Sequence, residues 1–250
     1  MIDIHTHILP GIDDGARSLH EAYEMALMAV RSGVQALVAT PHSNDTMGYV
    51  NYDSDRQKTL FESLKEILQE EKVPLQIYRG MENLASVDIP EKIICKKLLT
   101  LNQSRYVLVE FAFDEETWWI EVVLREIRKA GFVPVIAHPE RYGCVQDDPN
   151  CLYEWRVQGA LAQMNKGSIL GRFGSCAARA AETLLKHHLF TCIASDAHGA
   201  RIRTTDMSEI NRYIQRFYSM REQHLLLREN PLTILQDGTI KNQKEMLPIV

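Results

Sequence analysis

The feature that most constrains this chain is a repeated pattern in which a short apolar run ends in a residue able to bind a metal ion. The chain begins with one such run, residues 2–7, where His5 and His7 stand two positions apart. Because alternate side chains of an extended strand project to the same side, both imidazoles can reach one ion. The pattern recurs in residues 38–42, 76–82, 107–110, 135–138 and 192–198. Such repetition indicates one polar site assembled from the ends of several strands.

Strand-like and helix-like segments alternate along the whole chain. The expected strands are residues 2–5, 35–40, 75–80, 106–111, 132–137, 161–165 and 190–195. The expected helices run from the Ser18 capping box to just before Gly33, and then over 53–72, a short segment near Pro90, 115–130, 150–157, 175–187 and 206–221. This alternation is typical of βαβ units and a parallel sheet. Seven such units, with every candidate ligand at the carboxyl end of a strand, predict a closed or nearly closed α/β barrel with its active site on that face.

Composition sets further limits. The 250 residues carry a net charge of −5, which provides no basic surface for nucleic acid. No apolar run reaches the roughly 18 residues of a membrane-spanning helix, so membrane insertion is not expected. His5 and His7 stand where the apolar core of a signal peptide would be. With no linker-like stretch, residues 1–250 are expected to form a single domain.

The cysteines argue against a disulfide framework or a structural zinc site. There are five of them, an odd number, scattered and without Cys-x-x-Cys spacing. A reducing cytoplasm is therefore the expected location. No cysteine is followed by arginine at the sixth position, so a cysteine-based tyrosine phosphatase loop is not expected either.

The residues at the strand ends closely resemble the four motifs of the PHP (polymerase and histidinol phosphatase) superfamily of metal-dependent phosphoesterases. The matching segments are His5-Thr6-His7 with Asp13-Asp14, Pro41-His42, residues 138–141 and residues 195–198. Residues 4–15, 39–42, 108–111, 162–168 and 171–174 further resemble the bacterial protein-tyrosine phosphatases encoded with capsule and exopolysaccharide genes. The resemblance extends from Met1 to a turn at Glu229-Asn230-Pro231 and implies a distorted TIM-like (β/α)7 barrel of the PHP type.

The resemblance also implies a site of three divalent metal ions. His5, His7, Glu82 and Asp196 would hold the first ion, Glu82 with Glu110 and His138 the second, and Asp14, His42 and His198 the third. Asp13 is an open alternative to Asp14, because two adjacent carboxylates in a loop could exchange roles. Nitrogen and oxygen ligands without sulfur suit manganese, iron, zinc or magnesium. The family resemblance favours manganese.

Two arginines are expected to bind the phosphoryl group, because the planar guanidinium donates two parallel hydrogen bonds to phosphate oxygens. Arg141 closes the segment 138–141, and Arg203 lies in the loop after His198. Arg203 is favoured over Arg201 by alignment with the family, although both could belong to a solvated basic loop. The expected reaction is hydrolysis of phosphotyrosine by a metal-activated hydroxide without a covalent phosphoenzyme. The implied substrate is the phosphotyrosine tail of a membrane-associated bacterial tyrosine kinase that controls capsule or exopolysaccharide synthesis.

Other interpretations remain open at this stage. Tyr49, Phe113, Trp118 and Trp119 could line the mouth of the site, or the tryptophans could pack on the barrel. Taken singly, Glu110 could be the buried partner of an arginine. A histidinol phosphatase or another small-molecule phosphatase of the superfamily would use the same ligands. A phosphodiesterase or nuclease is disfavoured by the charge of −5, and a non-enzymatic scaffold by the presence of all nine expected ligands.

Overall fold

The computed structural model describes residues 1–241 and 245–249, and it confirms an α/β fold. Residues 242–244 and 250, which belong to the expected single domain of residues 1–250, lie outside the described residues. The strands are β1 (Ile2–Thr6), β2 (Ala36–Ala39), β3 (His42–Ser43), β4 (Gln76–Arg79), β5 (Glu82–Leu84), β6 (Tyr106–Glu110), β7 (Val133–Ala137), β8 (Leu161–Asn165) and β9 (Cys192–Ala194). All seven expected strands are present. β3 and β5 continue β2 and β4 beyond short interruptions at residues 40–41 and 80–81.

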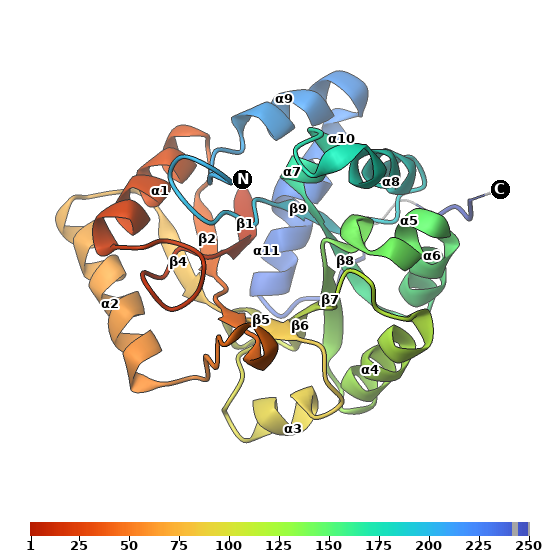
Figure 1. The fold of residues 1–250 in the computed structure, drawn as a ribbon. Coiled ribbons are helices and arrows are strands. Elements are labelled where there is room, and N and C mark those ends of the chain that lie inside the picture. The colour runs from red at the N-terminus through yellow and green to blue at the C-terminus, as the bar shows by residue number, and fades with distance from the viewer. Residues whose placement is uncertain (242–244, 250) are drawn as a thin grey trace.

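The strands pair in parallel and follow one another around a common axis (Figure 1). One sheet has the order β1-β2-β4, and the other has the order β3-β5-β6-β7-β8-β9. The last strand meets the first where His7 N–H donates to Ala197 O at 2.8 Å and Asp196 N–H donates to His5 O at 2.9 Å. The arrangement is the distorted barrel that the βα alternation predicts, with the carboxyl ends of the strands gathered on one face.

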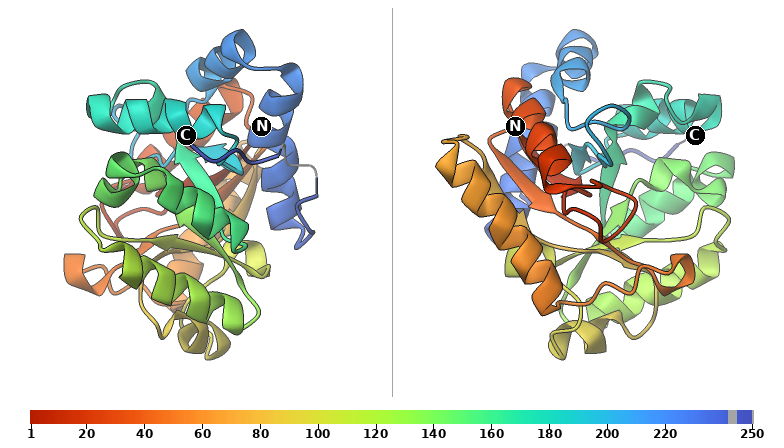
Figure 2. Two further views of the ribbon diagram at one scale, coloured as in Figure 1. Left: turned by 90° about the vertical axis from the view of Figure 1, so that its right-hand side faces the viewer. Right: turned by 60° about the vertical axis from the view of Figure 1, so that its left-hand side comes forward.

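Helices surround the strands. The expected helices are α1 (Leu19–Arg31), α2 (Asp55–Glu70), α3 (Ile89–Ile94), α4 (Thr117–Lys129), α6 (Asn150–Val157), α8 (Gly174–Lys186) and α9 (Ser208–Phe217). Figure 2 shows α4, α6 and α8 stacked along one side of the barrel and α1 beside α2 on another. The sequence did not predict the short elements α5 (Gly143–Asp147), α7 (Lys166–Ile169), α10 (Met220–His224), α11 (Asn230–Leu235), η1 (Asp45–Met47), η2 (Leu101–Gln103), η3 (Pro139–Arg141) and η4 (Leu225–Glu229).

The prediction of a turn at Glu229-Asn230-Pro231 is wrong. The π-helical segment η4 runs directly into α11, and Pro231 occupies the first turn of that helix. Proline is tolerated there because the first N–H groups of a helix have no partner within the helix. The expected helix over 206–221 is also divided, since α9 ends at Phe217 and a Ser219 capping box opens α10.

Two apolar layers hold the barrel together. The outer layer lies between strands and helices, with Leu37 of β2 packed in the same cluster as Met25 of α1 and Phe61 of α2. The inner cluster fills the barrel and consists of Ile2, Ile4, Ala36, Val38, Leu101, Tyr106, Leu108, Val135, Ala137, Leu161, Cys192, Ala194, Ile234 and Leu235. Its last two members come from α11, which lies behind the centre of Figure 1. Helix α11 therefore closes the amino-terminal end of the barrel, opposite the polar residues.

An irregularity in β1 allows neighbouring residues to contribute to both the apolar and the polar end of the barrel interior. The register of β1 against β2 shifts between Asp3 and Thr6. Ile4 belongs to the inner cluster, while the next residue, His5, contacts Gln163 at the polar end of the same interior. Adjacent residues of a regular strand point to opposite faces, so the shift changes the alternation of side chains.

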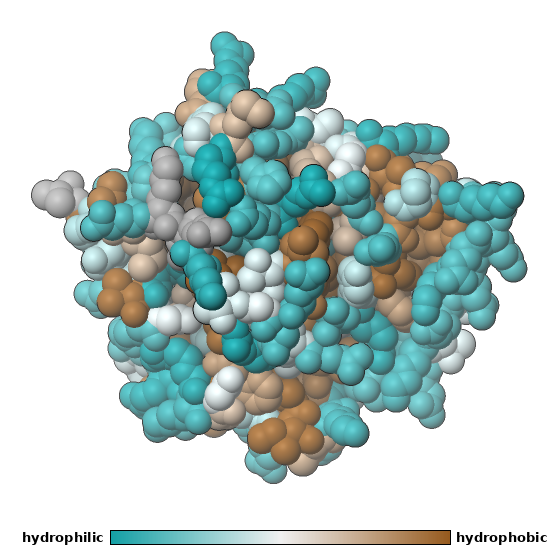
Figure 3. All heavy atoms as spheres, turned by 180° about the vertical axis from the view of Figure 1, so that it is seen from behind, coloured by the Kyte–Doolittle hydropathy of each residue, from teal (hydrophilic) through white to brown (hydrophobic). Residues whose placement is uncertain are grey.

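On the face opposite to that of Figure 1, hydrophobic residues form separate patches within a mostly polar surface (Figure 3). None of the described helices combines the length and the apolar character that a membrane crossing requires.

Candidate metal centre

The structure brings the nine expected ligands together around one buried carboxylate, Glu82, at the start of β5. Its Oε2 atom lies 3.1 Å from both His5 Nε2 and His7 Nε2, and its Oε1 atom lies 3.2 Å from His138 Nε2. His42 Nδ1 lies 3.0 Å from the same Oε2 atom. These residues lie at or just beyond the carboxyl ends of β1, β2, β4 and β7, which meet at one face of the barrel.

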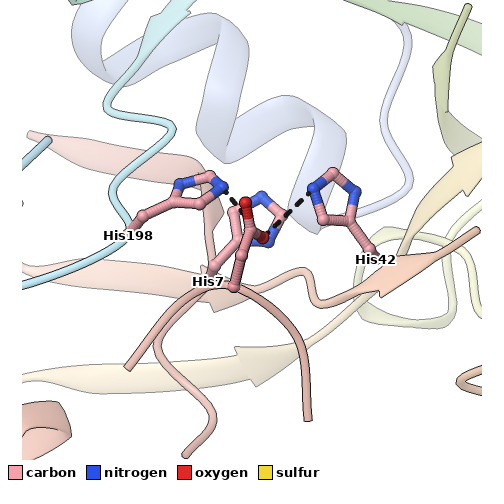
Figure 4. Close-up of side chains that lie close together, drawn as sticks. His7, His42 and His198 are labelled. Atoms are coloured by element: carbon pink, nitrogen blue, oxygen red, sulfur yellow. Dashed lines mark ion pairs between the residues drawn. The ribbon is translucent and has the colours of Figure 1, made fainter. Parts of the chain in front are cut away.

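A second group of donors lies beside this cluster. Asp14 Oδ1 is 3.5 Å from His42 Nε2 and 3.4 Å from His198 Nε2. Figure 4 shows the rings of His7, His42 and His198 close together, with dashed lines marking the ion pairs of His42 and His198. The three rings surround a common point although they come from three different segments of the chain. No single local motif therefore forms this group.

Two further carboxylates complete the set. Asp196 Oδ1 lies 3.6 Å from both His5 Nε2 and His7 Nε2. Glu110, at the end of β6, lies 3.5 Å from His42 Nδ1 through Oε2 and 3.5 Å from His138 Nε2 through Oε1. Its neighbours are imidazoles rather than an arginine, which favours the metal-ligand interpretation of Glu110 over that of a buried arginine partner.

Asp13 and Asp14 have different surroundings. Asp13 Oδ2 lies 2.8 Å from His7 Nδ1 and accepts from His42 N–H at 3.0 Å, so it orients ligands from behind. Gln163 does the same for His5 Nδ1, at 2.8 Å. The turn that carries both aspartates also requires Gly15, because a Cβ there would lie 2.0 Å from His7 O. The Asp14 side chain is 38% exposed and lies beside the rings of His42 and His198 instead.

The residues fit divalent metal ions on two grounds. Three groups of donor atoms, each within 4.8 Å of one another, are found among the described residues: His7, Asp14, His42 and His198; His5, His7 and Asp196; His42, Glu82 and Glu110. In addition, Glu82 Oε2 and His42 Nδ1 form no well-directed hydrogen bond with any described residue despite their close approach. Lone pairs that crowd one point without good hydrogen-bond geometry are typical of ligands that share an ion.

Burial and neighbouring charges shift the pKa values of the cluster in both directions, and the carboxylates of Glu82 and Glu110 raise the pKa of His42 to about 10 despite its burial. Burial, reinforced by the neighbouring Glu82 carboxylate, raises the pKa of Glu110 to about 8. Burial would raise the pKa of Glu82 too, but the surrounding imidazoles hold it well below its usual range. Burial lowers the pKa of His138 to about 4. Cations would stabilise the carboxylates in their charged form and the imidazoles in their neutral form, which is the state that binds metal.

The two expected arginines approach the cluster from the side of Asp196. Arg203 Nη2 donates to Asp196 Oδ2 at 2.6 Å, and Arg141 Nη1 lies 3.7 Å from the same atom. Asp196 therefore divides the site, with Oδ1 toward the imidazoles and Oδ2 toward the guanidinium groups. Arg201, the alternative to Arg203, is exposed.

The backbone is unusual at several of these positions. His138 has a φ of 33°, and Asp196 and Arg203 each have a φ of 49°. Non-glycine residues in this region cost on the order of 1–3 kcal/mol each and concentrate at functional sites. His138 directly follows β7, and Asp196 lies two residues beyond β9, so both conformations occur where the chain leaves a strand.

Aromatic residues flank the site on two sides. The Tyr49 ring stacks on His42, with centroids 5.9 Å apart, and the Phe113 ring lies 5.9 Å from His138. Trp119 packs against the outer apolar layer, whereas Trp118 is 63% exposed. For Trp119, this contact favours the alternative in which tryptophan packs on the barrel.

Sequence reasoning assigned no role to several residues that contact this site. Gln163 supports His5, and Asn165 Nδ2 donates to Asp196 Oδ2 at 2.5 Å. Phe173 lies beneath both arginines. Only the family-like segments 162–168 and 171–174 marked them, without indicating a contact.

Comparisons with known proteins agree with this geometry. A family model for capsular polysaccharide synthesis proteins, CpsB/CapC, matches residues 1–236. The chain is 33% identical to tyrosine-protein phosphatase YwqE of Bacillus subtilis, over 97% of this chain and 94% of that protein. It is also 33% identical to the putative tyrosine-protein phosphatase CapC of Staphylococcus aureus, with the same coverage.

Solved structures give a similar result. One from a study of YwqE from Bacillus subtilis and CpsB from Streptococcus pneumoniae, described there as unique metal-dependent tyrosine phosphatases, matches with a TM-score of 0.90 and 32% identity. That match covers 100% of both chains. A dihydropyrimidinase from Brevibacillus agri shares only the fold, with a TM-score of 0.56 and 9% identity over 98% of this chain and 73% of its own.

Proposed function

This chain belongs to the CpsB/CapC family of capsular polysaccharide synthesis proteins, and we propose that it is a metal-dependent protein-tyrosine phosphatase acting through three divalent ions. The observation that carries the proposal is the convergence of nine histidine and carboxylate side chains from separate strand ends, with two arginines beside them. No cysteine belongs to this set. The named relatives are tyrosine phosphatases, which supports the same reaction here.

We propose that the ligands divide among the ions as the family resemblance implies. His5, His7, Glu82 and Asp196 would hold one ion, Glu82, Glu110 and His138 a second, and Asp14, His42 and His198 a third. His7 and His42 lie close enough to a second group of donors to contribute there as well. We propose manganese, with iron, zinc or magnesium as alternatives, since the donors are nitrogen and oxygen alone. Asp14 rather than Asp13 is the proposed ligand, because Asp13 is occupied with His7 Nδ1.

The side chains around the ions have separate tasks. When bound, the ions lower the pKa of coordinated water and stabilise charge on the phosphoryl oxygens. Arg141 and Arg203 bind the non-bridging phosphoryl oxygens and orient the phosphorus. Asp13 and Gln163 hold the rings of His7 and His5 in the orientation that presents Nε2 to the site. The phenolate of tyrosine is a good leaving group, since its conjugate acid has a pKa of about 10.

We propose a phosphotyrosine segment of a membrane-associated bacterial tyrosine kinase as the substrate. We also propose that residues 1–250 form a single domain and that the reaction takes place in the cytoplasm. Phe113 is 44% exposed beside His138, and Tyr49 lies beside His42. These rings can contact the aromatic ring of phosphotyrosine at the rim. The net charge of −5 argues against a nucleic-acid substrate.

A small-molecule phosphatase of the PHP superfamily, such as histidinol phosphatase, is the second candidate, because it needs the same ligands. The test compares turnover of a phosphotyrosine peptide, histidinol phosphate and a nucleotide diester, each with manganese. We expect the peptide to be turned over at least tenfold faster than the others. Preferential turnover of histidinol phosphate would overturn the proposed substrate.

A further inference from the structure

We infer that helix α7, together with Phe173, positions both phosphoryl-binding arginines. The inference rests on the role that the proposed function gives to Arg141 and Arg203. The Cζ atom of Arg141 lies 4.4 Å from the centroid of the Phe173 ring, and that of Arg203 lies 5.7 Å from it. One aromatic ring thus supports two guanidinium groups that come from different parts of the chain. Such stacking orients a guanidinium while leaving its N–H groups available.

The ring of Phe173 is itself fixed by Gly167. A Cβ at Gly167 would lie 2.5 Å from Phe173 Cε2 and 3.1 Å from Cδ2, so any larger residue would displace the ring. Gly167 does not have a positive φ, and its small size rather than its flexibility is what the position requires. The backbone of α7 therefore forms the floor on which the ring lies.

The same helix fixes the loop that carries Arg203. The Lys166 side chain is 2% exposed, and its Nζ atom donates to Thr204 O and Asp206 O, at 2.5 Å each. On the other side of Arg203, His198 N–H donates to Arg203 O at 2.8 Å. The loop is thereby held on both sides of the arginine.

Helix α7 also holds the turn that carries Arg141. Glu140, the residue before Arg141 in η3, is buried, and its Oε1 atom accepts from Asn165 N–H at 2.9 Å and from Ser168 Oγ at 2.7 Å. The family-like segments 162–168 and 171–174 contain none of the proposed metal ligands. Their contacts indicate a common role. They form a support that places both guanidinium groups near Asp196 Oδ2.

The first test is Phe173→Leu, which removes the aromatic face and leaves an apolar side chain. We expect turnover of phosphotyrosine peptide to fall about tenfold, a size consistent with loss of one or two cation–π contacts. The inhibition constant of inorganic phosphate should rise by a similar factor, while metal content and melting temperature stay at the parent values. Phe173→Tyr should stay within about twofold of the parent. Phe217→Leu, on the exposed surface of α9, is the matched control and should be silent.

Two double-variant experiments distinguish positioning from general damage. Gly167→Ala should reproduce the effect of Phe173→Leu, but it should add little in the Phe173→Leu background, where no ring remains to be displaced. Likewise, Phe173→Leu should have no further effect on phosphate inhibition once Arg141 and Arg203 are both replaced by alanine.

Additive effects in either experiment, or a loss of bound metal in Phe173→Leu, would overturn the inference. If Arg141→Ala and Arg203→Ala are damaging and Phe173→Leu is silent, the inference alone fails. If both arginine variants are silent, the proposed role of the arginines fails, and the inference fails with it.

Discussion

The two sides of the active site are built in different ways. The histidines and carboxylates come mostly from strand ends, and most are nearly inaccessible to solvent, as in His5, Glu82 and Asp196. The arginines come from a short 3-10 turn and a loop, and their side chains are 18% exposed in Arg141 and 29% in Arg203. The strand backbone places the first group directly, whereas contacts from α7 and Phe173 place the second.

Because the two sides are built differently, metal binding and phosphate binding should be lost in different variants. Removing a ligand leaves buried groups of like charge without their ion, so metal content and catalysis should be lost together. Removing an arginine leaves the ligand cluster in place, so phosphate binding should weaken while the ions remain. Each of the following predictions relates the phosphatase activity of a sample to its bound metal.

The largest effect is expected from removal of the ions themselves. Chelation should abolish phosphatase activity, and added manganese should restore it, because the ions supply the nucleophile and neutralise phosphoryl charge. Iodoacetamide should do little, since no cysteine belongs to the site. Loss of activity after thiol alkylation with full metal content would contradict the mechanism.

The next largest effect is expected from His42→Ala and Asp196→Ala. Each removes a buried donor that contacts several others, so elemental analysis should show reduced metal content and turnover should fall by about 10³ or more, since catalysis depends on the ions. Circular dichroism should show that the barrel is retained. Full metal occupancy with near-normal turnover in His42→Ala would exclude His42 as a ligand.

Arg141→Ala and Arg203→Ala should reduce turnover on the order of 10²–10³, by analogy with loss of one preorganised oxyanion donor. Metal content should equal that of the parent protein, which is the sharpest contrast with the ligand variants. Lysine at either position should restore activity only in part, because it offers a point charge instead of a planar fork. Arg201→Ala is the internal control and should be nearly neutral. A damaging Arg201→Ala with a silent Arg203→Ala would reverse the assignment.

The smallest effect is expected from Asp13→Asn. The amide keeps the size of the side chain but loses the charge that orients His7 Nδ1. Metal affinity should fall about 10–100-fold, as is usual for residues that support a ligand, and excess manganese should restore turnover. Asp14→Asn should not be rescued as completely, and equal rescue of the two variants would contradict the distinction between them.

Several parts of this structure follow from local sequence. The seven expected strands appear because β-branched runs bounded by turn residues have few other ways to bury their side chains. The nine expected ligand positions converge because parallel strands of one barrel end on one face. The helix from Asn150 to Val157 has the predicted bounds.

Other parts required contacts between distant residues. α11 is helical although Pro231 suggested a turn, because Ile234 and Leu235 gain burial by closing the barrel. The register shift in β1 lets Ile4 and His5 face the same interior. It arises from the pairing of β1 with β2, which is a contact between distant residues. No local pattern indicates either feature.

The sequence by itself determined the α/β alternation, the chemistry of the donors and the face on which they gather, because these depend on side-chain periodicity and residue type. Only the tertiary structure decided that Asp13 supports His7 while Asp14 faces the site, and that Phe173 lies beneath Arg141 and Arg203. Asp13 and Asp14 are distinguished by the positions of His42 and His198, which come from other segments of the chain. Phe173 lies 32 and 30 positions from the two arginines, and contacts at such separations leave no periodic signal in the chain.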